Sequence, residues 1–578
     1  MKNLLDELLR PGRSGRREER LDLLWLAALL LVLVATGIGL RDPWPADEPR
    51  FALIARDMAA THQWLIPSVG GDVYADKPPL FFWVMAALLS ITGSVRWSFL
   101  LPSLFAAAGC TVLVYDLGRR LWNREVGLAA GLALLFTVQF LWQARQAQID
   151  ATLCFFTTLG LYGLLRHCLL GPDWKWYGIG WAACGFGIIT KGVGFLPLLV
   201  LIPYAFARGP HWQPRPVIEG GLRWLLGPAA LLLAVSVWLV PMLIAAQHDP
   251  VLQRYRDEIL FGQTVHRYAA AWHHREPFWY FIVDVIPGLW LPLTLLLPWL
   301  VPAWRSALRK RDLRILLLLA WIGLVVLFFS LSTGKRGVYV LPAVPAFALA
   351  AAPYLAEIAM RRKAQLALFV LCALLAAAMI AGAVYMQLDA AARQELIDLY
   401  DIDVVTPMLI MGIGAGLLCL LARPSRGFVA WPMVFGFELL VVSFVIAPAI
   451  NDARSGAELM RTVEAKTRNV AELGVVAYKE QYLLQLRRRI VNFGHARWRE
   501  GDQEAADAAA WLAGSSDRVL LMDESTRALC FGSASAEPLG VMNRKDWFLV
   551  RGAANPECIA RGHAEAAIEY TPPAFETR

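Results

Sequence analysis

The first apolar stretch of the chain, residues 21–40, reads LDLLWLAALLLVLVATGIGL. About 20 apolar residues in an α-helix span the roughly 30 Å hydrocarbon core of a bilayer. No small-residue cleavage pattern follows this stretch and many similar segments come after it, so a membrane anchor is favoured over a signal peptide. A β-barrel would show alternation of apolar and polar residues instead of continuous runs. The sequence therefore predicts an α-helical polytopic membrane protein.

Apolar segments of this kind recur along the chain of 578 residues, of which 57% are hydrophobic. Their lengths predict about thirteen transmembrane helices. The predicted spans are residues 22–40, 97–119, 126–143, 151–169, 174–190, 192–208, 222–245, 280–302, 313–331, 338–356, 364–386, 404–422 and 427–448. The apolar block at 81–93 is short for a crossing, and we expect it to form an interfacial or re-entrant helix.

Basic connections between the spans predict the orientation, because Lys and Arg are enriched in cytoplasmic loops. With block 81–93 left out of the crossing count, the basic connections all fall on one side of the membrane. We therefore expect a bacterial inner-membrane protein with a cytoplasmic N-terminus and a periplasmic C-terminal tail. The same loops account for the net charge of +8, so no nucleic-acid partner is expected.

A change of composition near residue 450 predicts two domains. Residues 1–450 form the expected transmembrane domain, which carries periplasmic loops at 41–96 and 246–279. Residues 451–578 contain short strand-like runs and a helical stretch, which predict a small soluble α/β domain in the periplasm. In that compartment Cys530 and Cys558 can form a disulfide.

The first outward loop carries two adjacent carboxylates, Asp47 and Glu48, with Arg50 close behind. A carboxylate at this position can steer or deprotonate an acceptor. The alternative is structural, with Asp47 capping the next helix and Glu48 in its first turn. Later in the loop, Lys77 precedes a Pro-Pro corner that fixes its direction. Lys77 either neutralises a lipid phosphate or extends to the headgroups as a membrane anchor.

Further basic residues fall at the outward ends of spans, against the usual distribution of charge. A shared anionic ligand held between helix ends explains them together, although any single one can be there by coincidence. Tyr339 lies near the same level and suits either the site or an interfacial aromatic belt. The other substrate- and phosphate-binding candidates are Arg145, Asp150, Lys191, Arg254, Arg267 and Lys335.

Three histidines in loop 246–279, His266, His273 and His274, form the only candidate metal motif in the sequence. The motif is weak, because adjacent histidines point in different directions on a helix and no HExxH spacing occurs. Hydrogen bonding of these side chains to phosphate or to the tail domain is favoured. The alternative is a structural divalent metal, such as zinc, that joins this loop to another. No cofactor is expected for the chemistry.

Five features together resemble one family: the acidic loop after the first span, the Lys-Pro-Pro corner, the Arg145 to Asp150 turn, an outward lysine and the Ser-x-x-Lys-x-x-x-Tyr-x-x-Pro stretch at 332–342. The family is the GT-C integral-membrane glycosyltransferases of the protein O-mannosyltransferase superfamily. Within it, the chain is most similar to the bacterial lipid A 4-amino-4-deoxy-L-arabinose transferases. The resemblance covers the whole chain, including the spans and the soluble tail.

The resemblance implies transfer of 4-amino-4-deoxy-L-arabinose from undecaprenyl phosphate to a lipid A phosphate, with resistance to polymyxin and other cationic peptides as the result. It implies a catalytic role for Asp47 and a contact between Lys77 and the donor phosphate. Arg267, Lys191 and Lys335 are phosphate ligands by position only. Many relatives have Glu-Lys-Pro where this chain has Asp-Lys-Pro at 76–78, so a ligand role for that acidic side chain is less well supported.

Other functions fit the same charged residues. A related polyprenyl-phosphate-sugar transferase could use a protein or another glycan as its acceptor. A transporter of polyprenyl-linked sugars would need similar charges, but the paired half-repeats typical of transporters are not found in the sequence. A purely structural scaffold would leave the charged outward face unexplained. For the transferase, the expected partners are the lipid-linked donor, lipid A and membrane lipids, and the protein is expected to be a monomer.

Overall fold

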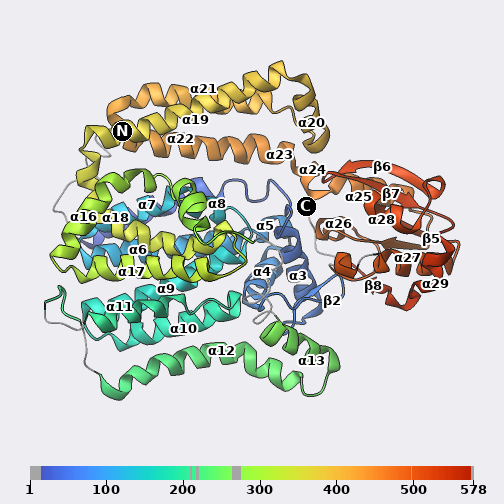
Figure 1. The fold of residues 1–578 in the computed structure, drawn as a ribbon, viewed down its shortest axis with the longest axis horizontal. Coiled ribbons are helices and arrows are strands. Elements are labelled where there is room, and N and C mark those ends of the chain that lie inside the picture. Colours follow the sequence, from blue (N-terminus) through green and yellow to red (C-terminus); the bar gives the residue numbers. More distant parts are fainter. Residues whose placement is uncertain are drawn as a thin grey trace.

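The structure, a computed structural model, describes residues 15–207, 211–216, 220–262, 275–495, 497–500 and 502–573. Helices build the part of the chain up to Ala449, and a domain of mixed helices and strands follows at one end of the molecule (Figure 1). The segment between the first two long helices, in blue, lies where these two parts meet.

Eight helices in the described part of the chain are long and apolar enough to cross a membrane. They are Val95–Leu121, Ile149–Leu170, Gly221–Ala245, Leu313–Leu331, Gly337–Ala359, Arg362–Leu388, Val405–Ala422 and Pro424–Ala449. Two strongly bent pairs, Arg124–Leu135 with Val138–Ala144 and Phe281–Leu289 with Thr294–Arg309, bring the number to ten if each pair is one span. The chain is therefore a multi-pass membrane protein, as predicted.

The other three predicted spans also contain helices, but these are shorter or less apolar. α2 (Arg16–Leu30) continues into the π-helical turn η1 (Leu31–Ala35). α10 (Trp174–Lys191) is followed by the 3-10 turn η2 (Leu196–Val200) and α11 (Leu201–Phe206). The number of thirteen crossings thus stays a prediction.

The helices differ in how much of their apolar surface other helices cover. In Gly337–Ala359 78% of the apolar window is buried, against 22% in Arg362–Leu388, so the first is central and the second is left for lipid. α19 (Arg362–Leu388), α21 (Val405–Ala422) and α22 (Gly427–Val441) form a layer along one side of the body in Figure 1. The inner helices are α6 (Leu101–Leu121), α7 (Arg124–Leu135), α8 (Val138–Ala144), α9 (Ile149–Leu170), α16 (Leu297–Arg309), α17 (Leu313–Leu331) and α18 (Val344–Ala359).

Small residues allow α9 and α10 to approach closely. A Cβ on Gly163 of α9 would lie 2.4 Å from the carbonyl oxygen of Trp176 and 2.8 Å from the Cα of Gly180 on α10. Such contacts replace the hydrophobic effect as the basis of helix association in lipid. At the other ends of the same two helices, Lys191 of α10 forms an ion pair with Asp150 of α9.

The segment between η1 and α6 forms three helices and a short hairpin. α3 (Glu48–Thr61) is buried along most of its length, and the hairpin of β1 (Ser68–Val69) and β2 (Asp72–Val73) follows it. α4 (Leu80–Thr92) is the short apolar helix expected at 81–93, and α5 (Val95–Ser98) leads into α6. On the far side of the body, α12 (Leu226–Ala245) leads to α13 (Pro250–Asp257) and the π-turn η4 (Glu258–Gly262), as Figure 1 shows.

The C-terminal part is a small α/β domain, as predicted. Its six-stranded sheet has the order β6-β7-β5-β3-β4-β8, in which β3, β4 and β5 are parallel neighbours. The strands are β3 (Glu472–Val475), β4 (Ile490–Asn492), β5 (Arg518–Asp523), β6 (Ala536–Met542), β7 (Lys545–Val550) and β8 (Ile568–Tyr570). Its helices are α24 (Asn451–Ser455), α25 (Ala457–Lys466), α26 (Glu480–Gln485), α27 (Gln503–Ala513), α28 (Glu524–Cys530) and α29 (Pro556–Arg561). A disulfide joins Cys530 to Cys558, whose Cα atoms are 5.8 Å apart.

Candidate functional site

A polar pocket of about 130 Å³ lies where α3, the loop after β2, and the ends of α9 and α10 meet. Four basic and three acidic residues contribute to its wall, with an amide and two phenols among the others. The lining residues are Asp47, Arg50, Phe51, Tyr74, Asp76, Lys77, Gln148, Ile149, Asp150, Lys191, Arg336 and Tyr339. Six of the sequence candidates are therefore neighbours in one cavity: Asp47, Arg50, Lys77, Asp150, Lys191 and Tyr339. Asp76, which precedes Lys77, lines the cavity as well.

Asp47 is the N-cap residue of α3, but its side chain makes no capping hydrogen bond. Its carboxylate instead faces two guanidinium groups in the pocket. Arg336 Nη2 donates to Asp47 Oδ2 at 3.1 Å, and Arg50 Nη1 lies 3.9 Å from Asp47 Oδ1. The purely structural alternative for Asp47, helix capping, is thus not what the structure shows.

Glu48 lies outside the pocket, although we predicted it to bind substrate. Its oxygens accept hydrogen bonds from Arg41 Nη2 at 2.8 Å, from the Trp44 amide at 2.9 Å and from the Ala147 amide at 3.0 Å. These contacts satisfy the buried carboxylate and fasten the loop before α3 to the turn before α9. Glu48 therefore supports the position of Asp47 without facing the cavity.

Arg145 also differs from its predicted role in phosphate binding. Its guanidinium donates to the Leu33 carbonyl, to Thr36 Oγ1 at 3.2 Å and to Ser443 Oγ. Leu33 lies in the π-turn η1 and Ser443 in the π-turn η9 (Val442–Ile446). Arg145 thus joins the π-turns η1 and η9, and it does not line the pocket.

Arg336 lines the pocket in place of Lys335, the residue that we predicted to bind phosphate. Lys335 is 5% exposed and its Nζ donates to the Glu276 carbonyl at 2.7 Å. Arg336 has an extended backbone, in which successive side chains point to opposite sides, and it reaches the pocket instead. Burial lowers the pKa of Arg336, but the charge and hydrogen bond of Asp47, together with Asp150 and Tyr339, outweigh this and hold that pKa above its usual value.

The opposite wall of the pocket holds a second ion pair. Lys191, at the end of α10, contacts Asp150 in the first turn of α9, and its Nζ lies 4.6 Å from the centroid of the Tyr339 ring. Lys77 completes the basic wall, with Nζ donating to the Asp76 carbonyl at 3.1 Å. Cations from four separate segments therefore converge on one cavity, which is the arrangement that binds an anionic ligand.

Some candidates lie elsewhere or cannot be placed. Arg254 is exposed on α13 and does not line the pocket. Arg267, His266, His273 and His274 lie outside the described residues. Among the residues that the structure describes, no group of three or more His, Cys, Asp and Glu is arranged to hold a metal ion. The zinc site therefore stays an untested prediction.

Besides the apolar Phe51 and Ile149, three polar or charged pocket residues were not among the predicted site residues: Tyr74, Gln148 and Arg336. Tyr74 is two residues from Asp76, so in an extended segment both side chains share one side. Gln148 is the residue before α9, and its Oε1 is buried with no hydrogen-bond partner among the described residues. Neither spacing nor charge distinguishes Gln148 from the neighbouring Gln143 and Gln146 in the sequence.

Comparisons with known proteins place this geometry in context. Residues 76–240 match the family model described as dolichyl-phosphate-mannose-protein mannosyltransferase. An undecaprenyl phosphate-alpha-4-amino-4-deoxy-L-arabinose arabinosyl transferase of Pseudomonas fluorescens is 33% identical over 340 residues, and one of Yersinia pestis is 29% identical over 344. These alignments cover 56% and 58% of this chain, and 58% and 59% of the relatives.

The crystal structure of ArnT from Cupriavidus metallidurans bound to undecaprenyl phosphate superposes with a TM-score of 0.72. The superposition covers 91% of this chain and 97% of that chain, at 22% sequence identity. The chain has the GT-C fold. In this GT-C fold the pocket lies at one end of the helical body, beside the α/β domain. The resemblance seen in the sequence is confirmed for the fold, and the family match overlaps the pocket segments from Asp76 to Lys191.

Proposed function

We propose that the chain is a glycosyltransferase that moves 4-amino-4-deoxy-L-arabinose from undecaprenyl phosphate to a phosphate of lipid A. The observation that carries the proposal is the pocket in which Asp47 lies among Arg50, Lys77, Lys191 and Arg336. The names of the relatives and the GT-C fold support the choice of donor and sugar. The predicted topology puts this pocket at the periplasmic face of the inner membrane.

The basic residues suit the departure of a lipid phosphate. When the bond between the anomeric carbon and the phosphate oxygen breaks, its electron pair stays on the phosphate. Preorganised cations stabilise such developing charge most effectively in a partly enclosed site. Lys77, on the loop before the short apolar helix α4, is assigned to this phosphate, and Arg50 also lines the pocket.

Asp47 is assigned to the sugar. A phosphate acceptor is already ionised, so one of its oxygens can attack the anomeric carbon without a strong base. Asp47 then orients the reactants and stabilises the positive charge that develops on the sugar ring. With a hydroxyl acceptor, Asp47 would instead accept the proton as a general base. The two guanidinium groups beside Asp47 hold its carboxylate in a defined direction.

The direct test uses purified protein, undecaprenyl phosphate-linked aminoarabinose and lipid A, with mass spectrometry of the products. The expected result is lipid A heavier by one aminoarabinose, and loss of this product with Asp47→Asn. Full activity of Asp47→Asn would refute the catalytic assignment. Transfer of the sugar to a different acceptor, and not to lipid A, would favour the related polyprenyl-phosphate-sugar transferase.

The same proposal can be tested in cells. Cells that lack the protein are expected to have lipid A without the sugar and to be more sensitive to polymyxin, because the aminoarabinose masks negative charge on the surface. Unchanged lipid A mass in these cells would contradict the proposed acceptor. If the lipid-linked donor crosses the membrane of vesicles that contain the protein, and no sugar is transferred, the transporter of polyprenyl-linked sugars would be favoured.

A further inference from the structure

The C-terminal domain supplies a side chain that binds directly to a pocket residue. Glu480 Oε1 accepts a hydrogen bond from Arg50 Nε at 2.7 Å, although the two residues are 430 positions apart in the sequence. Glu480 is 7% exposed and Arg50 lines the pocket. A charged hydrogen bond to a carboxylate this well buried fixes the direction of the guanidinium.

His495 extends this contact to the second pocket segment. Its Nε2 lies 3.0 Å from the same oxygen of Glu480. Its backbone amide donates to Asp72 Oδ2 at 3.1 Å, and its ring packs edge-on to Tyr74 with 6.1 Å between centroids. Glu480 and His495 therefore contact both α3 and the hairpin that leads to Lys77.

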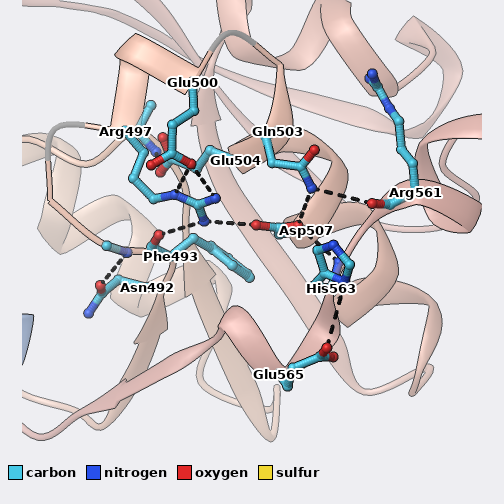
Figure 2. Close-up of polar contacts among 12 residues, drawn as sticks. Asn492, Phe493, Arg497, Glu500, Gln503, Glu504, Asp507, Arg561, His563 and Glu565 are labelled. Carbon is cyan, nitrogen blue, oxygen red and sulfur yellow. Dashed lines mark hydrogen bonds and ion pairs between the residues drawn. The ribbon is translucent and has the colours of Figure 1, made fainter. Parts of the chain in front are cut away.

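Polar contacts of the residues that flank His495 in the chain hold its turn in place. Figure 2 shows these contacts around Arg497 and Asp507. Arg497 Nη1 donates to the Phe493 carbonyl at 3.0 Å and contacts Asp507 Oδ2 at 2.8 Å. Asp507 in turn accepts from the amide of His563 at 2.9 Å. The turn that carries His495 is thus fastened to α27 and to the segment after α29. It is a rigid support for its contacts with the hairpin and Glu480.

Similar contacts fix the turn before Glu480. Glu504 Oε1 accepts from the Ala477 amide at 2.7 Å at the end of β3. Tyr478 Oη donates to the Val69 carbonyl at 3.3 Å, and Asn492 Nδ2 donates to the Gly70 carbonyl at 2.9 Å. Parallel sheets of this kind usually bind ligands beyond the carboxyl ends of their strands. Here the residues after β3 and β4 bind the chain's own hairpin and α3 instead.

We propose that Glu480 is a positioning residue that prepares Arg50 for the phosphate of the lipid donor. This inference rests on the proposed function and adds that the C-terminal domain completes the donor site. Because Nε of Arg50 is bound to Glu480, the guanidinium is held with Nη1 at 3.9 Å from Asp47, too far for a close ion pair. Without Glu480, we expect the guanidinium to turn toward Asp47, which already binds Arg336, so that Arg50 no longer faces the phosphate and Asp47 is paired on both sides.

The test measures binding of undecaprenyl phosphate to the full-length protein in detergent, together with sugar transfer. Glu480→Ala is expected to weaken binding about tenfold, the loss typical of one charged hydrogen bond. Glu480→Gln, which keeps an oxygen for Arg50 Nε, is expected to recover part of it. Arg50→Ala is expected to weaken binding similarly, and adding Glu480→Ala to it should cause no further loss, because Glu480 acts through Arg50.

Tyr570→Phe is the matched control. The Tyr570 hydroxyl accepts from Arg56 Nη2 at 3.0 Å and donates to Asp57 Oδ1 at 2.6 Å, so it joins the same domain to α3 away from the pocket. Equal loss of binding in Tyr570→Phe and Glu480→Ala would overturn the inference, because general docking would then explain both. Additive losses in the Arg50 and Glu480 double variant would also overturn it. If the wild type and the variants bind undecaprenyl phosphate with these relative affinities, but the wild type transfers no sugar, only the proposed function would be refuted.

Discussion

Asp47 and Arg336 meet across the pocket with 3.1 Å between Oδ2 and Nη2, although 289 positions separate them in the sequence. The contact joins the loop after the first membrane helix to the segment before η7 (Gly337–Ala343). The position of the carboxylate assigned to the sugar therefore depends on both elements, and each can be tested separately.

Arg336→Ala is expected to lower the rate of sugar transfer by about tenfold or more, because Asp47 loses its charged hydrogen bond. Lys335→Met is the matched control, since Lys335 is the adjacent basic residue but binds the Glu276 carbonyl. Lys335→Met should reduce the unfolding temperature and leave KM for the donor unchanged. A larger kinetic effect from Lys335→Met than from Arg336→Ala would show that the assignment of the two residues is reversed.

Asp47 and Lys77 are expected to affect different steps. Asp47→Asn should lower kcat by about 100-fold or more, within the usual range for removal of a group that stabilises charge in the transition state, while undecaprenyl phosphate still binds. Lys77→Ala should instead weaken binding of the donor phosphate, and Lys77→Arg should restore part of it. Steady-state kinetics and a direct binding measurement separate the two effects. Equal losses of binding in both variants would contradict the division of roles.

Asp57 is expected to make stability depend on pH. Burial raises its pKa from the ordinary 3.8 to about 6, and Arg56 and the Tyr570 hydroxyl oppose the shift only in part. Between these values the folded protein holds a proton that the unfolded chain has released, so stability falls as pH rises. From pH 7 to pH 5, wild-type protein should gain about 1 kcal/mol relative to Asp57→Asn.

Thermal or chemical unfolding of both proteins at each pH measures this difference. Glu504, whose pKa burial raises to about 7, titrates in the same range, but it does so in both proteins and cancels from the comparison. A constant difference between wild type and Asp57→Asn across this range would contradict the predicted protonation of Asp57.

The disulfide between Cys530 and Cys558 is expected to stabilise the C-terminal domain. Closing a loop between residues 28 positions apart contributes about 3 to 4 kcal/mol by the chain-entropy estimate. The double serine variant should therefore unfold at lower temperature, with the same transfer rate while the domain stays folded. Alkylation should modify Cys530 and Cys558 only after reduction. Labelling without reduction in protein taken from cells would argue against the oxidising compartment of the proposed topology.

The membrane architecture was predictable because it depends on local composition. Runs of apolar residues indicated where helices lie, and the short run at 81–93 was correctly separated from the long ones as α4 (Leu80–Thr92). The strand-like runs after residue 450 likewise indicated the α/β domain. The number of crossings was less accessible, since helices such as α11 are shorter than a full span.

The pocket was predictable only where charge and loop position agree. Asp47 and Lys77 stand out as charged residues beside helix-breaking prolines, and both line the cavity. Whether Lys335 or Arg336 reaches the pocket depends on which way an extended backbone turns, and this direction cannot be predicted from composition. Arg145 was misread because a cation at a helix end can also bind backbone carbonyls. Glu480 was not predicted, because nothing local indicates that its domain reaches Arg50.

The contact between Arg50 and Glu480 also sets an order in time. Ribosomes add about 5 to 20 residues per second, so Glu480 is made tens of seconds after Arg50, 430 positions earlier. On the proposed role of Glu480, membrane insertion of the first helices leaves the donor site unfinished until the last domain has been exported and has folded. Export and folding of that domain then act as a checkpoint, because incompletely synthesised chains are expected to bind the lipid-linked donor more weakly.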